Sequence, residues 1–298
     1  MDFFCDRPHR HRRLQRQLTR KVEDAAGRQW SASNPPTEQR EKLRRDFLKQ
    51  PGAKDVFTAI PAEDSWSIPI RGAAWRTAVA MWLGLPHGML TVEECQGKHA
   101  ACQRSGKEWD HYQSCLRING CSKKTRRHDG MVYNLAWCLR SGLNLDPKIE
   151  PKYLDVEGRK RPDIQVAVGN SEFLVDVAVL HTHGKGRQRW GTDALMDEEK
   201  AKRKHYQDMA RGMHAEVIPF VVDASGVWGP SATKWVSQLL NKAVEEGFIH
   251  ESDVRQERRR IRYAVAHALH KGNAAMWYDY NHRNPTAPRL QSPWFTEW

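Results

Sequence analysis

Two hydrophobic runs between residues 164 and 179, separated by a polar Gly-Asn pair, predict a β-hairpin. The runs Ile164 to Val168 and Ser171 to Val179 are rich in β-branched residues, and Gly169-Asn170 between them is typical of a two-residue turn. With the ends of the two runs directly flanking this turn, the register places Asp163 opposite Asp176.

Two carboxylates that face each other on one side of a hairpin repel unless a cation lies between them. A hard divalent ion such as Mg²⁺ or Mn²⁺ suits an all-oxygen site of this kind. The pair Asp163 and Asp176 therefore predicts a metal site. The alternative is a register shifted by one residue, with one aspartate in a loop.

Periodic patterns predict further elements around the hairpin. We expect helices at 73–85, 129–142, with Asp129 as the N-cap, 193–211, 232–244 and 253–270. We expect strands at 149–154 and 215–222. From residue 129 onward the order is helix, strand, hairpin, helix and strand, an α/β arrangement written αβββαβ.

The charge balance of the chain changes this picture. Its 298 residues have a formal net charge of +12, which favours a polyanionic partner, most commonly nucleic acid. Basic runs at 9–21 and 255–262 either contact phosphates or are solvated surface. The first run could also act in nuclear import. No apolar run approaches 18 residues and no signal-peptide pattern opens the chain, so we expect an intracellular, soluble protein with no membrane partner.

Cysteines and histidines gather between residues 95 and 121. Thiolates and imidazoles at this density fit a structural Zn²⁺ site better than disulfides in a chain without a secretory signal. The alternative is a set of reduced cysteines on a loop. The four expected zinc ligands are Cys95, Cys102, His111 and Cys115.

Several short motifs give the chain a family resemblance. They are Arg127-His128-Asp129, Glu150-Pro151, Arg161-Pro162-Asp163, Asp176, the run from Lys202 to Tyr206, and Pro219-Phe220. In this order they resemble the restriction-like endonuclease domain at the C-terminal end of some non-LTR retrotransposon polyproteins, a branch of the PD-(D/E)XK nucleases. The Cys/His cluster resembles the zinc-binding segment that precedes that domain, and the match covers about residues 70–285.

The resemblance implies a restriction-endonuclease-like αβββαβ core with a small zinc-binding segment and flanking helices. It implies Mg²⁺-dependent hydrolysis of a DNA phosphodiester in the nucleus, which nicks a target site so that the freed 3′ end primes reverse transcription. Asp163 and Asp176 would be the metal ligands, and Glu150 would complete the metal shell. DNA, an RNA template and a reverse transcriptase are the partners it implies.

The chain departs from the family pattern at one position. Ala178 stands where the superfamily usually has a lysine, so the ammonium group must come from elsewhere. The retrotransposon branch uses a Lys-x-x-Lys-Tyr pattern on the following helix. Here Lys202 matches the first lysine, whereas His205 replaces the second and Lys204 lies beside it, about 100° away around a helix. We expect Lys202 as the catalytic lysine, with Lys204 second.

The remaining expected roles are contacts to DNA. His128 and Arg127, placed before a helix N-terminus, would either contact a phosphate or cap the helix locally. The full set of expected DNA-binding residues is Arg127, His128, Arg161, His205 and Tyr206.

Four regions follow from these patterns. They are a basic N-terminal region (1–70), a helical and zinc-binding segment (71–126), the endonuclease core (127–230) and a C-terminal helical region (231–298). The alternative function is a catalytically inactive, zinc-containing nucleic-acid-binding remnant, in which the nuclease core serves as scaffold.

Overall fold

A computed structural model describes residues 39–50, 52–53, 55, 78–79, 113, 122–151, 161–182 and 190–282. The chain divides into two compact units, residues 1–43 and 44–298. The first unit contributes only the beginning of helix α2 (Gln39–Phe47) to the described residues. The expected zinc ligands and the basic run at 9–21 lie outside the described residues, as does nearly all of the helix expected at 73–85. All that follows concerns the second unit.

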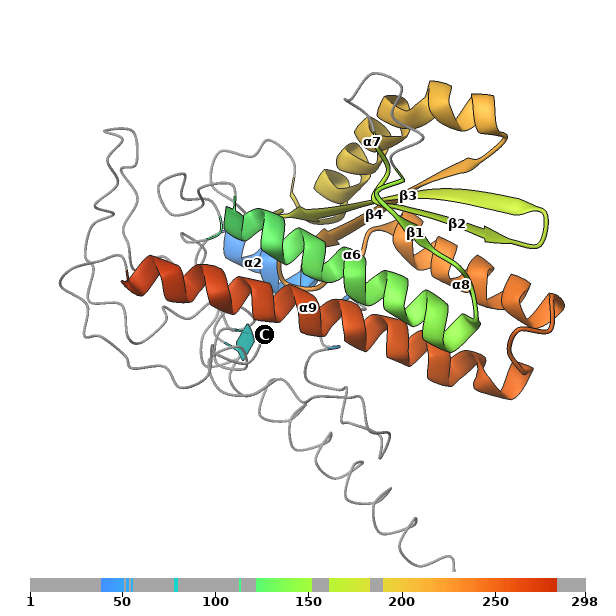
Figure 1. The fold of residues 1–298 in the computed structure, drawn as a ribbon. Coiled ribbons are helices and arrows are strands. Elements are labelled where there is room, and N and C mark those ends of the chain that lie inside the picture. Colours follow the sequence, from blue (N-terminus) through green and yellow to red (C-terminus); the bar gives the residue numbers. More distant parts are fainter. Residues whose placement is uncertain are drawn as a thin grey trace, which may run out of the picture. The chain divides into compact units, whose positions relative to one another are not determined.

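A four-stranded sheet forms the centre of the second unit (Figure 1), in the order β1 (Lys148–Ile149), β2 (Ile164–Val168), β3 (Ser171–Leu180) and β4 (Glu216–Asp223). The first three strands are antiparallel, and β3 and β4 are parallel. In the β2–β3 hairpin Val168 pairs with Ser171 and Ile164 with Val175. This is the register predicted from the Gly169-Asn170 turn, and Gly169 supports it with a φ of +54°.

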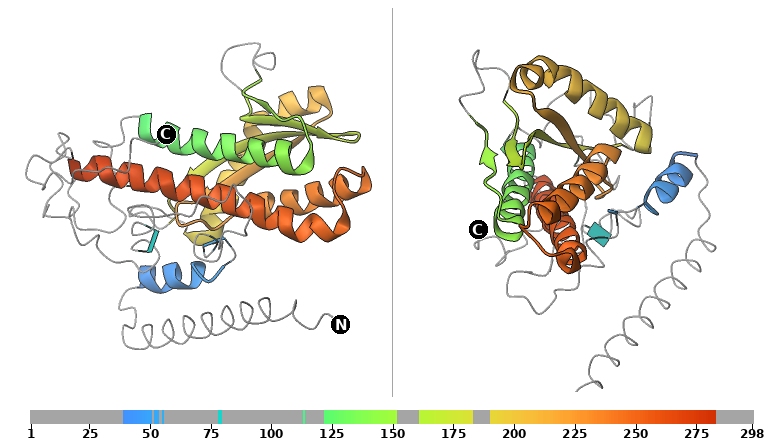
Figure 2. Two further views of the ribbon diagram at one scale, coloured as in Figure 1. Left: turned by 60° about the horizontal axis from the view of Figure 1, so that its bottom comes forward. Right: turned by 90° about the vertical axis from the view of Figure 1, so that its right-hand side faces the viewer.

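Helices cover both faces of the sheet (Figures 1 and 2). On one face, α6 (Ser122–Leu143), α8 (Pro230–Glu245) and α9 (Val254–His282) share the main hydrophobic core with alternate residues of β2, β3 and β4. On the other face, α7 (Gly191–Met213) packs Tyr206 and Ala210 against Leu174 and Val217. The site described below lies on the α7 face.

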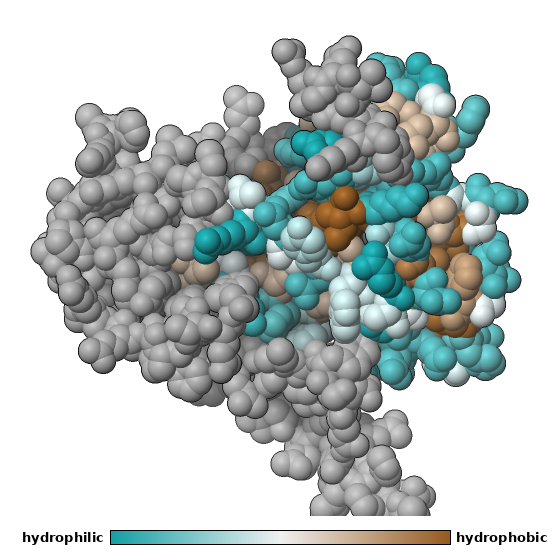
Figure 3. All heavy atoms as spheres, in the orientation of Figure 1, coloured by the Kyte–Doolittle hydropathy of each residue, from teal (hydrophilic) through white to brown (hydrophobic). Residues whose placement is uncertain are grey.

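Trp235 is fully buried in the main core, where its ring meets the edges of Phe173 and Phe220 at centroid distances of 6.2 and 6.1 Å. Hydrophilic residues cover much of the described surface in the view of Figure 3, with hydrophobic patches between them. No helix among the described residues is both long enough and apolar enough to cross a membrane.

The order α6-β1-β2-β3-α7-β4 is the αβββαβ order predicted from the sequence, and the α/β class is confirmed. Three boundaries were wrong, and one of them is the end of α9, which the sequence predicted at residue 270 and which lies at His282. Helix α6 begins at Ser122, so Asp129 is not its N-cap and His128 lies inside the helix. The cause is tertiary, because the buried Arg127 donates from Nη1 to Gln113 Oε1 and Asn273 Oδ1 and so holds the basic first turns in helical form.

The third wrong boundary is that of strand β1. It ends at Ile149 instead of continuing from there toward residue 154. Glu150 adopts a φ of +43°, in the left-handed region that a strand does not use. The backbone therefore turns away at Glu150, although its N–H still donates to the carbonyl oxygen of Asp163 at 2.9 Å.

Acid destabilisation is expected from His270, a core residue of α9 that is 2% exposed. Burial, with a smaller contribution from His267, lowers the pKa of His270 to about 4. His270 is therefore protonated below about pH 6.5 in the unfolded chain, whereas in the folded protein it is protonated only below about pH 4. The free energy of unfolding should fall by about 3 kcal/mol as the pH drops through this window.

Urea unfolding at several pH values between 7 and 4 checks this expectation. His270→Leu should flatten the pH dependence, whatever its effect on stability at pH 7. His205→Leu, which changes an exposed histidine, is the matched control and should keep the parent slope. Equal slopes in all three proteins would show that His270 does not carry the effect.

Candidate active site

Asp163 and Asp176 are brought together at the end of the β2–β3 hairpin. Asp163 immediately precedes β2, and Asp176 follows Val175, which pairs with the first residue of β2. Asp176 shares its sheet face with Leu174, which packs against α7. The side chains of Asp163 and Asp176 are only 14% and 5% exposed, so neither charge is well solvated.

Helix α7 supplies two partners for Asp176 from consecutive turns. Lys202 Nζ forms an ion pair with Oδ2 at 2.9 Å. The hydroxyl of Tyr206 lies 2.9 Å from Oδ1 and 2.8 Å from the carbonyl oxygen of Arg161, and shares its single proton between them. Because residues four apart lie on one helix face, Lys202 and Tyr206 reach the same carboxylate.

The electrostatics of Asp176 and Lys202 follow from burial and mutual contact. Burial raises the pKa of Asp176 and the nearby Asp163 raises it further, whereas Lys202 and Tyr206 act in the opposite direction. Burial lowers the pKa of Lys202, but Asp176, Glu198 and Asp163 outweigh it, and the pKa is raised overall. Lys202 is therefore a charged ammonium group that compensates two crowded carboxylates.

His128 holds Asp163 from the α6 side. Its Nε2 lies 3.1 Å from Asp163 Oδ2 and 3.0 Å from the carbonyl oxygen of Val177, and its Nδ1 lies 3.2 Å from Asp129 Oδ1. Both ring nitrogens face acceptors, an arrangement that suits the doubly protonated ring. Although burial lowers the pKa of His128, Asp163 and then Asp129 raise it to about 9.

The backbone fixes the same oxygen of Asp163. The N–H of Val177 donates to Asp163 Oδ2 at 2.6 Å, so this oxygen accepts from both His128 and the main chain. Within the described residues both recorded donors go to Oδ2, which leaves Oδ1 as the oxygen best placed to accept a cation. Asp163 is thus held in one orientation from two sides.

The carboxylate pair has the chemistry of a divalent-cation site. Mg²⁺ is commonly held by one or two carboxylates together with water and substrate phosphate oxygens. In the described part of the chain, no group of three or more His, Cys, Asp and Glu side chains gathers as a complete metal cage. Two crowded acids with a lysine ammonium beside them fit the sparser Mg²⁺ arrangement.

Other expected site residues lie elsewhere. Glu150 approaches the pair only through its backbone, and its side chain is exposed. Lys204 is exposed on α7, about 200° around the helix from Lys202, so it does not share the side chain direction of Lys202 toward Asp176. Arg127, expected on DNA, is 6% exposed and is engaged with Gln113 and Asn273.

The remaining expected DNA contacts divide between surface and interior. Arg161 and His205 are exposed, and the ring of His205 lies 4.7 Å from that of Tyr206. Tyr206 itself is 5% exposed and bonds to Asp176, so its position is that of a support for the carboxylate. The sequence held one signal for this role, the spacing of four between Lys202 and Tyr206.

Comparisons with known proteins assign no family to this constellation: no family model matches the chain, and no curated protein matches it.

Proposed function

We propose that this chain is a metal-dependent DNA endonuclease that hydrolyses a phosphodiester bond. The observation that carries the proposal is the buried pair Asp163 and Asp176, with Lys202 2.9 Å from the second carboxylate. Asp176 combines a pKa that burial raises with a specific charged partner, which is characteristic of functional sites. The net charge of +12 supports a polyanionic substrate.

In this proposal Asp163 and Asp176 hold Mg²⁺ or Mn²⁺, which when bound supplies polarisation of a phosphoryl oxygen and a lowered pKa of the attacking water. His128 and the Val177 N–H keep Asp163 oriented, and Tyr206 does the same for Asp176. Lys202 gives an ammonium group that stabilises charge developing on the phosphate.

The biological role that we propose is nicking of a target site in nuclear DNA, so that the freed 3′ end primes reverse transcription. This makes the chain the endonuclease module of a retrotransposon, working with an RNA template and a reverse transcriptase. A structural zinc ion held by Cys95, Cys102, His111 and Cys115 belongs to the same proposal. Loss of zinc on substitution of Cys102 by serine, measured by elemental analysis, tests it.

The direct test of the proposed reaction is nicking of supercoiled plasmid by the purified chain with Mg²⁺ or Mn²⁺, compared with EDTA. Metal-dependent conversion to the open circle is the expected result. If DNA is bound but never nicked, the chain is a catalytically inactive, zinc-containing nucleic-acid-binding remnant. That alternative is favoured by one observation, Ala178 in place of the usual lysine.

Tyr206→Phe is expected to slow nicking by about ten-fold, because Asp176 then loses the donor that fixes its Oδ1 atom. The free energy of unfolding should fall by about 1–2 kcal/mol, since the buried Asp176 carboxylate and the Arg161 carbonyl oxygen lose the hydroxyl proton that they share. Nicking rates and urea unfolding check both effects. Tyr133→Phe, at an exposed tyrosine of α6, should change neither.

A further inference from the structure

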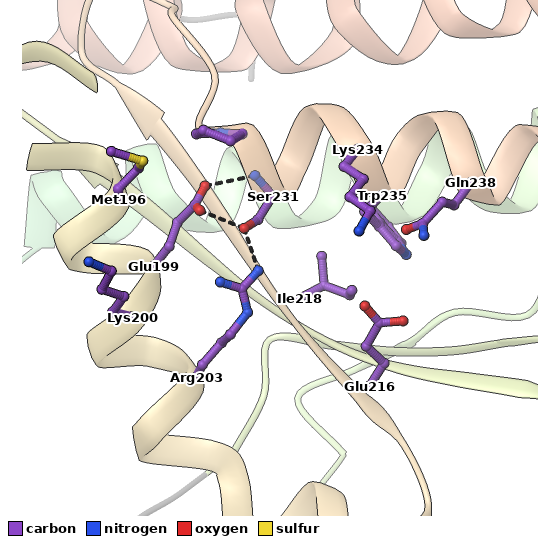
Figure 4. A pocket seen from close by; sticks show the side chains of 11 residues that line it. Met196, Glu199, Lys200, Arg203, Glu216, Ile218, Ser231, Lys234, Trp235 and Gln238 are labelled. Carbon is purple, nitrogen blue, oxygen red and sulfur yellow. Dashed lines mark hydrogen bonds between the residues drawn. The ribbon is translucent and has the colours of Figure 1, made fainter. Parts of the chain in front are cut away.

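A pocket of about 280 Å³ lies between α7 and α8 beside β4, which is an edge strand of the described sheet (Figure 4). Glu216 and Ile218 of β4 contribute to its wall, and α8 begins at its rim with Pro230. Neither carboxylate of the proposed active site, Asp163 or Asp176, lines this pocket. Charged and polar side chains line it together with apolar ones.

Three cationic side chains line the pocket from two helices: Lys200 and Arg203 from α7, and Lys234 from α8. Arg203 is held in place, because its Nη2 donates to Ser231 Oγ at 2.5 Å. That hydroxyl in turn donates to Glu199 Oε2 at 2.5 Å. In Figure 4 the chain of hydrogen bonds from Arg203 through Ser231 to Glu199 forms one side of the pocket.

The negative charge of Glu199 is largely compensated by hydrogen bonds from α8, so it offsets the charge of these cations only in part. It is 3% exposed, and its Oε1 accepts from the Ser231 N–H at 2.9 Å while its Oε2 accepts from the Ser231 hydroxyl. Both carboxylate oxygens are therefore occupied by the first turn of α8, where a negative charge is stabilised by the helix dipole. Glu216 is the other acid of the lining, and in Figure 4 it lies across the pocket from Glu199.

Trp235 adds an unsatisfied donor to the same lining. Its Nε1 is buried, and no hydrogen-bond partner for it lies within the described part of the chain. An indole N–H is a donor only, and leaving it unpaired in the interior costs free energy. Figure 4 labels Trp235 and Lys234 among the side chains that line the pocket.

We propose that this pocket binds a phosphate oxyanion, and that its source is a backbone phosphate of the nucleic acid cleaved at the active site. The assignment to a nucleic acid strand rests on the proposed function. Arg203 follows Lys202 directly on α7, about 100° around the helix axis, so one helix presents cations both to the carboxylate pair and to the pocket. Arginine and lysine donors match the acceptor oxygens of a phosphate.

The test uses the full chain in EDTA, so that binding is measured without cleavage. The Trp235 indole resonance is assigned in a ¹⁵N spectrum with the variant Trp235→Phe, and is followed during titration with inorganic phosphate and with a short DNA duplex. DNA affinity is measured against salt concentration for Arg203→Gln/Lys234→Gln. Arg140→Gln/Arg211→Gln removes the same charge from exposed positions outside the pocket and is the control.

A shift of the Trp235 resonance with both phosphate and DNA, together with a salt slope lowered by about 1 in the pocket variant relative to the control variant, is the expected result. If the Trp235 resonance shifts with inorganic phosphate but not with DNA, and the two variants have equal salt slopes, the pocket does not bind a backbone phosphate of the nucleic acid. No shift with either probe would overturn the site. Because none of these readings depends on cleavage, absence of nicking would count against the proposed function alone.

Discussion

Asp163→Asn is expected to lower the rate of metal-dependent nicking by about 1,000-fold. The substitution keeps an acceptor for the Val177 N–H but removes the charge that a divalent ion requires. Loss of several kcal/mol of transition-state stabilisation corresponds to a rate change of this size. DNA affinity should be unchanged or improved, because a negative charge leaves a phosphate-facing surface.

Single-turnover nicking of plasmid and DNA binding in EDTA measure the two quantities separately. Asp208→Asn removes the same charge from a side chain of α7 that is 92% exposed, and should behave as the parent protein. Retention of metal-dependent nicking by Asp163→Asn, beyond what a mock purification shows, would remove Asp163 from the catalytic machinery. If the parent protein does not cleave DNA and Asp163→Asn loses DNA binding, the result would favour the alternative in which the nuclease core is only a scaffold for nucleic-acid binding.

Lys202→Met should separate metal binding from catalysis. In the parent protein the ammonium group lies 2.9 Å from Asp176 Oδ2 and competes with any other cation for that carboxylate. The variant is expected to bind Mg²⁺ or Mn²⁺ more tightly, yet to nick DNA about 100-fold more slowly because the ammonium no longer stabilises the phosphate. Without metal it should also lose about 2 kcal/mol of stability, since Asp176 remains buried without its cation.

Calorimetric Mn²⁺ titration, plasmid nicking and urea unfolding give the three readings for Lys202→Met. Lys204→Met is the matched control, because Lys204 is an exposed lysine of the same helix. Cleavage at the parent rate in Lys202→Met, or an equal loss in Lys204→Met, would contradict the role given to Lys202. Recovery of stability on addition of metal would indicate that the ion replaces the ammonium beside Asp176.

Local rules in the sequence were sufficient for the hairpin and for the partner of Asp176. The Gly169-Asn170 turn determined the register of β2 and β3, and the helical period of α7 placed Lys202 and Tyr206 on one face. These features depend on residues close together in the chain. The same holds for the αβββαβ order, which follows from the periodicity of each segment.

Contacts between distant segments escaped prediction. His128 and Asp163 are 35 residues apart, and no periodicity links a residue of α6 to the start of β2. The start of α6 was misplaced for a similar reason, since the buried bonds of Arg127 to Gln113 and Asn273 keep a basic segment helical. Glu150 was expected near the metal from a motif alone, and its left-handed backbone could not be foreseen.

The anchoring of Arg127 has a consequence for how the site responds to distant change. Arg127 joins the start of α6 to Asn273, deep in α9, and the next residue, His128, orients Asp163. A shift of α9 by a fraction of an ångström would therefore be transmitted through Arg127 and His128 to the carboxylate of Asp163. The long C-terminal helix, which contributes no side chain to the proposed active site, would then set the orientation of Asp163 through two adjacent residues of α6.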